Sequence, residues 1–338
     1  MCWHTIAWRS VSQSPGKQRL LVASNRPRGI QPNRRKDQHV PAPGNFRIAA
    51  CITTMHRPSI LRDCLNGIVA CRPMPDVIVV SDDSRDPAQI EATRAVVAEF
   101  PQVIYATGPR RGVCANRNSA LIAAMASNLD YVTFLDDDTA VPTDFFFIAQ
   151  TYFGQLAPTE RVKTILTGYR DDLGSGASRL NFRGYFEKCA IPETATVCAS
   201  FFPMAFLATE RWDENIFFGS EDAEICLRAL ARGFPIQFTP ALKTRHLAVG
   251  AGTLQKEFSS GITKYELQCE AARLYIGIKR YSRITPSVLK LSAFVIIYFV
   301  HLTIRLTSRG LIQALIPIVR AANLGALRKP RSVPEAVK

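Results

Sequence analysis

Three consecutive aspartates, Asp136, Asp137 and Asp138, follow the apolar, β-branched run 131–135 (YVTFL). Carboxylates this close repel one another unless something compensates their charge. In an extended segment alternate side chains share a face, so we expect Asp136 and Asp138 to point one way and Asp137 the other. Two carboxylates converging at a strand end suit Mg²⁺ or Mn²⁺, which binds few protein oxygens and shares the rest with phosphates. The alternative is a solvated acidic turn that caps a helix beginning near Pro142.

Glu221 and Asp222 form a second acidic pair, at the start of a segment whose apolar residues have helical spacing. Ser220 is expected near the N-cap of this helix and Gly233 at its C-terminal end. Acids in a first helical turn usually only complement the helix dipole, so the pair alone does not indicate catalysis. His246 follows the short strand and turn expected in FPIQFTPALKTR, and a lone histidine is more often packed or solvent-facing than a ligand.

The elements that would position these side chains alternate between short apolar runs and longer helical segments. This alternation is typical of an α/β fold with a mostly parallel sheet covered by helices. The expected elements, in chain order, are a strand at 46–54, a helix at 57–71, a strand at 76–81, a helix at 87–100, a strand at 102–107, a helix at 114–127 and a strand at 131–135. Open sheets of this kind bind ligands at the carboxyl ends of their strands, where the aspartates fall.

The formal net charge of +14 would suggest nucleic acid or an anionic membrane surface as partner. The distribution of this charge along the chain distinguishes between these two partners. Residues 1–45 carry eight Lys or Arg against one acid and residues 271–338 carry twelve against one, so 46–270 is net −4. A nucleic-acid-binding protein should carry its basic residues on the folded domain, so we expect no nucleic-acid partner. Residues 1–44, rich in Pro, Arg and Asn without periodicity, are expected to be a disordered basic tail.

The stretch 289–306 (LKLSAFVIIYFVHLTIRL) is strongly apolar, but Lys290, His301 and Arg305 interrupt it. A clean membrane span needs about 20 predominantly apolar residues, so this stretch is a marginal span. Whether it crosses a membrane or lies on one stays open from the sequence.

A second segment, 310–327, pairs apolar residues with Arg320. Basic amphipathic helices lie in the interface of anionic bilayers, so we expect residues 285–326 to attach the protein to the cytoplasmic face of a cell membrane, followed by a basic tail at 327–338. The nine cysteines lack zinc spacing and follow no secretory signal, which also favours the cytosol. The alternative is a helical hairpin buried against the α/β domain, at a homodimer interface.

Six motifs occur in the order and approximate spacing of the family 2 glycosyltransferases with the GT-A fold: CITTMHRP, VIVVSDDSRD, RRGVCANRNSAL, FLDDDTAVP, FGSEDAEICLRALARGF and TRHLA. The chain resembles this family over about residues 46–282. The resemblance implies a GT-A domain at 45–284 and an inverting enzyme dependent on Mn²⁺ or Mg²⁺. Such an enzyme moves a sugar from a nucleotide-sugar donor to a hydroxyl of a glycan or lipid-linked acceptor, which we expect to belong to cell-envelope or polysaccharide synthesis.

The resemblance also implies which side chains contact the donor nucleotide. They are Thr53, Thr54, Arg57, Asp82, Asp83, Arg117, Asn118, Asp136 and Asp137. SDDSRD departs from the family's two acids followed by Gly-Ser, so the register of this motif is ambiguous. Asp82 is the favoured contact to the base, and Asp83 is alternatively a turn residue. Asn118 is alternatively a packing residue.

The remaining roles concern the reacting groups. By the same resemblance, Asp138 coordinates the metal, Asp136 lies near the metal and the donor's ribose, and His246 approaches the metal or the diphosphate. Asp222 is the general base that takes the proton of the acceptor hydroxyl, and Glu221 orients the acceptor. Between these motifs, the aromatic residues Tyr185, Phe186 and Trp212 either stack on a sugar ring or fill the core.

Two other functions fit parts of the pattern. A sugar nucleotidyltransferase shares the α/β layout and the metal-binding acids but usually has a Gly-rich phosphate loop near its first strand, and CITTMHRPSI has none. A non-catalytic membrane scaffold would keep the C-terminal helices but would not need acids at several strand ends.

Overall fold

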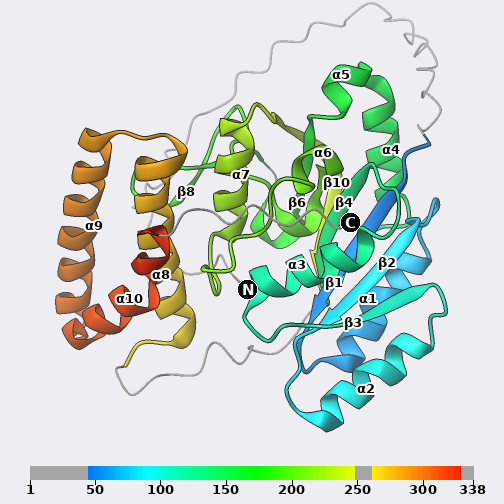
Figure 1. Ribbon diagram of the computed structural model, residues 1–338, viewed down its shortest axis with the longest axis horizontal. Coiled ribbons are helices and arrows are strands. Elements are labelled where there is room, and N and C mark those ends of the chain that lie inside the picture. Colours follow the sequence, from blue (N-terminus) through cyan, green and yellow to red (C-terminus); the bar gives the residue numbers. More distant parts are fainter. Residues whose placement is uncertain (1–44, 175, 248–260, 329–338) are drawn as a thin grey trace, which may run out of the picture.

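The computed structural model of the chain describes residues 45–174, 176–247 and 261–328 (Figure 1). The tail expected at 1–44 and the basic tail beyond residue 328 lie outside the described residues.

Strands and helices alternate strictly in the first part of the chain. They are β1 (Ile48–Thr54), α1 (Pro58–Val69), β2 (Val77–Asp82), α2 (Pro87–Ala98), β3 (Val103–Thr107), α3 (Val113–Ala124) and β4 (Tyr131–Asp136). The four strands are parallel neighbours in the order β3-β2-β1-β4. This confirms the elements that the apolar periodicity predicts.

Local chemistry explains where these helices begin. Pro58 and Pro87 each stand in the first turn of their helix, where a missing backbone N–H costs nothing. Asp86 precedes the second of them, and its side chain accepts the backbone N–H of Ala88 at 3.0 Å. Each helix therefore starts just beyond the carboxyl end of a strand and leaves that edge of the sheet open.

The second part of the chain is less regular. Its elements are β5 (Thr139–Ala140), α4 (Phe145–Gln155), α5 (Pro158–Arg161), β6 (Ile165–Arg170), η1 (Asp171–Leu173), β7 (Ser178–Leu180), β8 (Phe186–Lys188), η2 (Val197–Ala199), β9 (Ser200–Pro203), α6 (Met204–Leu207), α7 (Glu221–Ala231) and β10 (Ile236–His246). The eight-stranded sheet has the order β3-β2-β1-β4-β9-β6-β10-β5, with β9 antiparallel to both of its neighbours. The helix expected near Pro142 begins at Phe145.

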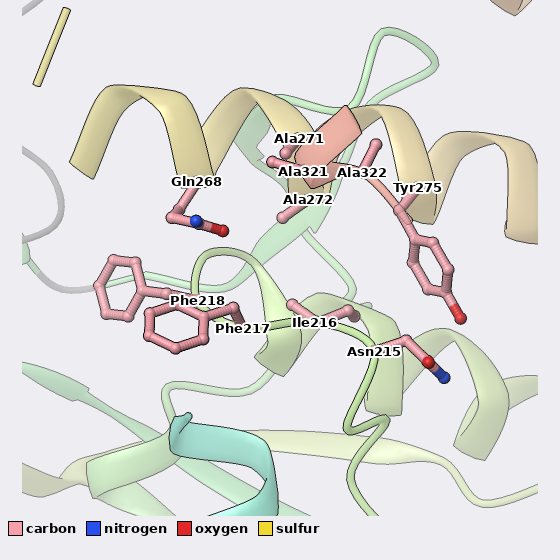
Figure 2. A pocket seen from close by; sticks show the side chains of 10 residues that line it. All are labelled: Asn215, Ile216, Phe217, Phe218, Gln268, Ala271, Ala272, Tyr275, Ala321 and Ala322. Carbon is pink, nitrogen blue, oxygen red and sulfur yellow. The ribbon is translucent and has the colours of Figure 1, made fainter. Parts of the chain in front are cut away.

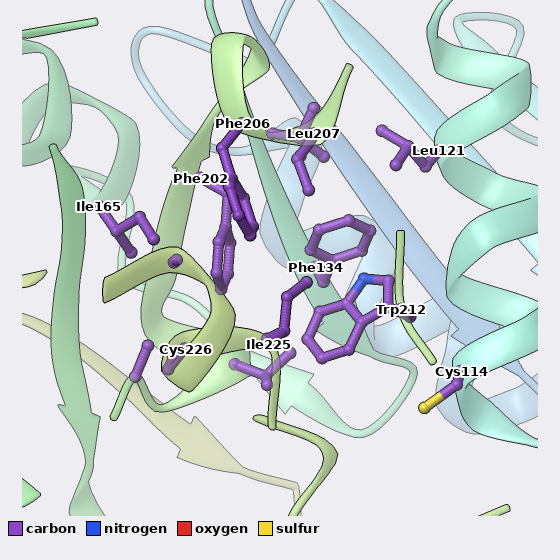
Figure 3. Packing of buried hydrophobic residues seen from close by; sticks show 14 of the residues in the cluster. Cys114, Leu121, Phe134, Ile165, Phe202, Phe206, Leu207, Trp212, Ile225 and Cys226 are labelled. Atoms are coloured by element: carbon purple, nitrogen blue, oxygen red, sulfur yellow. The ribbon is translucent and has the colours of Figure 1, made fainter. Parts of the chain in front are cut away.

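Two apolar cores cover the two faces of the sheet. Ala49 and Cys51 of β1 face one core, and Ile48, Ala50 and Ile52 face the other, as the two-residue period of a strand requires. In the first core, Phe134 and Phe202 pack edge-on against the indole of Trp212 (Figure 3). Trp212 therefore fills the core. Phe186 packs partly buried against the same core, and the Tyr185 ring lies under the guanidinium of Arg273.

The C-terminal helices form a separate layer at the end of the molecule opposite α2 (Figure 1). They are α8 (Lys264–Lys279), the π-helical turn η4 (Arg280–Ile284), α9 (Val288–Ser308), η5 (Ile312–Ala314), α10 (Leu315–Ala321) and η6 (Leu324–Arg328). Helix α8 has two buried faces: Tyr275 and Ile276 belong to the first sheet core, whereas Leu267 and Leu274 belong to a third core shared with α9 and α10. By length and composition, α9 is long and apolar enough to cross a membrane.

Candidate active site

The predicted site residues gather at the carboxyl edge of the sheet. Thr53 and Thr54 end β1, Asp82 ends β2 and Asp136 ends β4, and all but Asp136 are buried. His246 ends β10, which pairs with β5 so that His246 lies opposite Thr139, one residue beyond the aspartates. Strand ends that are far apart in sequence are therefore neighbours in space.

Asp137 is the buried member of the aspartate triplet. Its Oδ2 accepts hydrogen bonds from Thr54 Oγ1 at 2.6 Å and from Arg57 Nε at 3.1 Å, and Arg57 also pairs with its Oδ1. Burial raises the pKa of Asp137 to about 7, although the Arg57 charge opposes the rise. Arg57 spans two aspartates, because its Nη1 donates to Asp138 Oδ2 at 2.8 Å.

The expected division of the triplet into two faces is wrong in detail. Asp136 turns toward Arg117, whereas Asp137 and Asp138 share Arg57. The reason is that β4 ends at Asp136 and the next two residues form a turn, so the two-residue period of a strand no longer applies to them.

Asp138 and His246 face each other across the site. Asp138 Oδ1 is buried, accepts no hydrogen bond from the described residues and lies 3.4 Å from His246 Nε2. The backbone N–H of Leu247 donates to the carbonyl of Asp138 at 2.7 Å and so fixes the end of β10 against the triplet. A carboxylate oxygen without a partner beside an imidazole nitrogen is a donor set that fits Mn²⁺ or Mg²⁺.

Arg117 connects the triplet to the start of α7. Only 4% of its side chain is exposed, and its guanidinium lies over the ring of Trp212. Nη2 donates to Asp136 Oδ1 at 3.1 Å and Nη1 donates to Glu221 Oε1 at 2.9 Å. Burial works against the charged form of Asp136, but the Arg117 charge outweighs it and lowers the pKa of that carboxyl. Arg117 lies beneath the site and neutralises acids on both sides of it.

Asp222 has no such cation, since no ion pair to it forms among the residues that the structure describes. Its Oδ1 accepts only the backbone N–H of Ala223, at 2.8 Å. Burial, and after it the negative charge of Glu221, raises the pKa of Asp222 to about 7. A carboxylate with a pKa near neutrality is suited to taking up a proton at physiological pH.

The turn that leads into α7 has left-handed backbone and packs closely against α8. Gly219 (φ 103°) and Ser220 (φ 54°) both have left-handed backbone, and a Cβ on Gly219 would lie 3.1 Å from Cys269 Cα of α8. Ser220 is at the N-cap position as predicted, but its side chain makes no capping hydrogen bond. Its left-handed backbone explains this, because an N-cap residue normally has extended backbone.

Just before this turn, the segment 215–218 faces the C-terminal helices (Figure 2). Phe217 and Phe218 lie opposite Gln268 of α8, and the cavity left between these elements, with Ala321 and Ala322 of α10 in its wall, measures only about 10 Å³. This volume is too small for a substrate, so the contact is packing that supports the position of the acidic pair.

The two acids at the end of β2, Asp82 and Asp83, have different partners. Asp82 accepts from the Tyr105 hydroxyl at 3.1 Å and from the backbone N–H of Ser84 at 2.9 Å. Asp83 accepts the backbone N–H of Arg110 at 2.7 Å, and burial raises its pKa. Asp83 thus ties two loops together, which fits the turn alternative, and the base contact of Asp82 stays a prediction.

Asn118 behaves as a packing residue. Its side-chain amide donates to the backbone carbonyl of Trp212 at 2.9 Å and its Oδ1 accepts the backbone N–H of Trp212 at 2.9 Å, so it fixes the segment before α7 onto α3. A further charged residue at this edge is Arg170, at the end of β6, which the sequence motifs did not indicate. It is bound to Asp172 through two hydrogen bonds, of 2.6 and 2.9 Å, and it helps to lower the pKa of Asp136. Its position after a β-strand was the only signal.

A sequence profile described as glycosyltransferase-like family 2 matches residues 43–261. No curated protein matches the chain by sequence. A family profile that spans most of the chain favours a glycosyltransferase over the nucleotidyltransferase and scaffold alternatives.

Solved glycosyltransferases resemble the structure at low sequence identity. GalNAc-T7 with UDP, GalNAc and Mn²⁺ has a TM-score of 0.55 at 11% identity over 71% of this chain and 49% of that one, so the chain spans about half the length of that enzyme. S. aureus TarS 1-349 in complex with UDP-GlcNAc has a TM-score of 0.53 at 15% identity over 83% and 84% of the two chains. Mannosyltransferase PcManGT from Pyrobaculum calidifontis, with GDP-Man and Mn²⁺, has a TM-score of 0.51 at 14% identity over 87% and 79%. These likenesses concern the fold, which is GT-A. The chain therefore belongs to the glycosyltransferase-like family 2 and is a glycosyltransferase.

Proposed function

We propose that this glycosyltransferase moves a sugar from a nucleoside diphosphate to an acceptor hydroxyl in a single displacement that inverts the anomeric carbon, and that it uses Mn²⁺ or Mg²⁺. The observation that carries the proposal is the unpartnered, buried Asp138 Oδ1 facing His246 Nε2 at 3.4 Å, at the sheet edge where such folds bind ligands. The solved relatives that contain UDP or GDP-Man together with Mn²⁺ support it by analogy.

Asp138 and His246 would hold the cation, with Asp136 beside them. No group of three or more His, Cys, Asp or Glu side chains arranged to hold a metal ion occurs in the described part of the chain. Two protein ligands suit Mn²⁺ or Mg²⁺, because both ions readily take their remaining ligands from water and from substrate phosphates. When bound, the cation would neutralise the charge that develops on the leaving nucleoside diphosphate.

Asp222 is the proposed base. The acceptor oxygen forms a bond to the anomeric carbon while the bond from that carbon to the diphosphate oxygen breaks, and the diphosphate leaves with the bonding electron pair. The proton of the acceptor hydroxyl passes to Asp222, whose raised pKa makes it a receptive base near neutral pH. Glu221, fixed by Arg117 and by the backbone N–H of Gly219 at 2.9 Å, orients the acceptor.

For the acceptor we propose a glycan or a lipid-linked sugar of cell-envelope or polysaccharide synthesis, reached from the cytoplasmic side. Two features support this choice. The apolar helix α9 belongs to the layer that packs on the catalytic domain. The eight cysteines of the described residues are all free, as in a reducing compartment.

Thermal-shift measurements against a panel of UDP- and GDP-sugars, with and without Mn²⁺, test the donor and metal parts of this function. We expect stabilisation only when the right donor and Mn²⁺ are both present. Asp138→Ala should remove the Mn²⁺-dependent part and abolish transfer. The matched control is Asp144→Ala, an exposed aspartate at the start of α4 that makes no capping bond and should respond as the wild type does. Indifference of the wild type to every nucleotide sugar would contradict the proposed function.

A further inference from the structure

Helix α9 carries an apolar stripe on the side that faces away from the protein. The stripe consists of Leu289, Ile296, Ile297, Val300 and Ile304, whose exposed fractions lie between 40% and 81%. The spacing of seven, four and four residues from Leu289 through Ile296 and Val300 to Ile304 keeps these side chains on one face of the helix. An apolar face of this extent, left open to water on a folded protein, indicates an interaction surface.

The opposite side of α9 is fixed to the protein. Its buried residues, Phe294, Tyr298, Leu302 and Leu306, recur every four residues and pack in the third core. The Phe294 ring lies directly on Gly277 of α8, where an added Cβ would approach it to 1.9 Å. This close approach holds the two helices side by side.

Polar contacts secure the same face. The Tyr298 hydroxyl donates to the carbonyl of Glu270 at 3.0 Å, and Arg305 pairs with the Glu270 carboxylate at 3.0 Å. The arginine that interrupts the apolar sequence of α9 is therefore turned inward and does not interrupt the stripe.

Charge identifies the kind of surface that would cover the stripe. Residues 285–328 contain five Lys or Arg (Lys290, Arg305, Arg309, Arg320 and Arg328) and no Asp or Glu. Lys290 near the start of α9 flanks the stripe and is exposed, as is Arg320 on α10, whereas Arg309 just beyond the end of α9 pairs with Glu266 of α8 at 2.9 Å. An apolar face bordered by cations, without a single acid in the segment, complements an anionic bilayer.

We propose that α9 lies in the interface of an anionic membrane, with the stripe of Leu289, Ile296, Ile297, Val300 and Ile304 turned into the acyl boundary, and that it does not cross the bilayer. To cross, α9 would have to leave α8. It would expose the third core to lipid or water and break the Arg305–Glu270 ion pair, leaving Glu270 with Arg273 alone, and it would carry Arg305 into the bilayer, where a charged side chain is costly. This membrane surface is formed by α9, and the proposal does not depend on the chemistry assigned to Asp138 or Asp222.

Flotation of the full chain with vesicles tests the surface. Two vesicle types are used, phosphatidylcholine alone and phosphatidylcholine mixed with phosphatidylglycerol. We expect binding to the mixed vesicles that weakens with salt, and a roughly hundredfold lower partition coefficient for the double variant Ile296→Glu/Val300→Glu, because two apolar side chains are replaced by charges. The matched control is Ile122→Glu, which places the same charge on an isoleucine of α3 that is 53% exposed and outside the stripe.

A second variant separates the contribution of charge. Lys290→Glu/Arg320→Glu should lower binding to the mixed vesicles at least tenfold, since each cation near an anionic surface favours binding by about 1 kcal/mol. Melting temperatures without vesicles show that the variants fold.

Two results would overturn the membrane surface. One is equal vesicle binding by the wild type and Ile296→Glu/Val300→Glu, or no binding by either. The other is a wild type that is dimeric in light scattering and becomes monomeric in that variant without any vesicle binding, which would assign the stripe to a second copy of the chain. Because donor-dependent stabilisation is measured separately, failure here leaves the proposed glycosyl transfer intact.

Discussion

The two acidic regions of the site differ in how their charge is balanced. At the end of β4, two arginines pair with the three aspartates: Arg57 with Asp137 and Asp138, and Arg117 with Asp136. At the start of α7, Arg117 serves Glu221 alone and leaves its neighbour Asp222 without a cation in the described chain.

This difference sorts carboxylates of similar burial into two kinds. The Arg117 charge lowers the pKa of Asp136, whereas burial and the charge of Glu221 raise the pKa of Asp222 to about 7 although Arg117 opposes the rise. One buried arginine thereby pairs with an acid on each side of the site, whereas Asp222 at the start of α7, like Asp137 in the triplet, has a pKa raised to about 7. Environments that move the pKa values of neighbouring acids apart are a common way to divide their roles.

The largest expected effect concerns Asp222, the proposed base. We expect Asp222→Asn to lower transfer by about a thousandfold, because a general base contributes 10² to 10⁴ in rate. Donor-dependent thermal stabilisation should stay as in the wild type, since the proposed donor site is at the aspartate triplet and not at Asp222. The measurement is turnover with saturating donor beside the thermal shift. Full turnover by Asp222→Asn would show that another group takes the proton.

Replacing Arg117 tests how much its ion pairs with Asp136 and Glu221 contribute to stability. Arg117→Met leaves the largely buried Glu221 and the partly exposed Asp136 without their cation. Breaking a buried ion pair costs about 3 kcal/mol or more, and the partly exposed Asp136 pair should contribute less than that. We expect a lower free energy of unfolding in denaturant and weaker donor stabilisation. Arg117→Lys keeps the positive charge, but the single lysine nitrogen cannot pair with both carboxylates as the two arginine nitrogens do. The free energy of unfolding of Arg117→Lys should therefore lie between those of the wild type and Arg117→Met. Wild-type stability of Arg117→Met would mean that the two contacts carry little energy.

The pH dependence of transfer should report Asp222. Only the ionised carboxylate accepts the proton, so kcat/KM should be level above a pKa of about 7 and fall about tenfold for each pH unit below it. Initial rates between pH 5 and pH 9 in one buffer series at constant ionic strength give the profile. A rate independent of pH below 6 would contradict the raised pKa.

The smallest effect concerns Glu221. Its negative charge contributes to the raised pKa of Asp222 only after burial, so Glu221→Gln should move the acidic limb of the profile toward lower pH by less than one unit. A poorer acceptor KM should accompany the shift if Glu221 orients the acceptor. A shift of the limb toward higher pH would mean that the Glu221 charge does not act on Asp222 as inferred.

The regular part of the fold could be predicted closely from the sequence. From β1 to β4, apolar runs, helix-initiating prolines and short loops are local signals, and each predicted element is present within a few residues. The acidic positions could be predicted as well, because strand ends and helix starts mark the edge where ligands bind.

The partners of those acids could not be predicted. Arg57 meets Asp137 across 80 residues of sequence, and Arg117 meets Glu221 across 104. Such pairs depend on which strands become neighbours, including β9, which enters antiparallel between β4 and β6. The approach of His246 to Asp138 likewise requires the β5 and β10 pairing, and a two-residue strand leaves almost no signal in the sequence.

Helix α8 packs on two faces, with Tyr275 and Ile276 in the sheet core and Leu267 and Leu274 in the core shared with α9. Removing the C-terminal helices to obtain a detergent-free enzyme would therefore expose one face of α8 to water, and the shortened chain should aggregate through Leu267 and Leu274. Recoding the outward residues of α9 to polar ones, while keeping the helix, is the gentler route to a soluble catalyst.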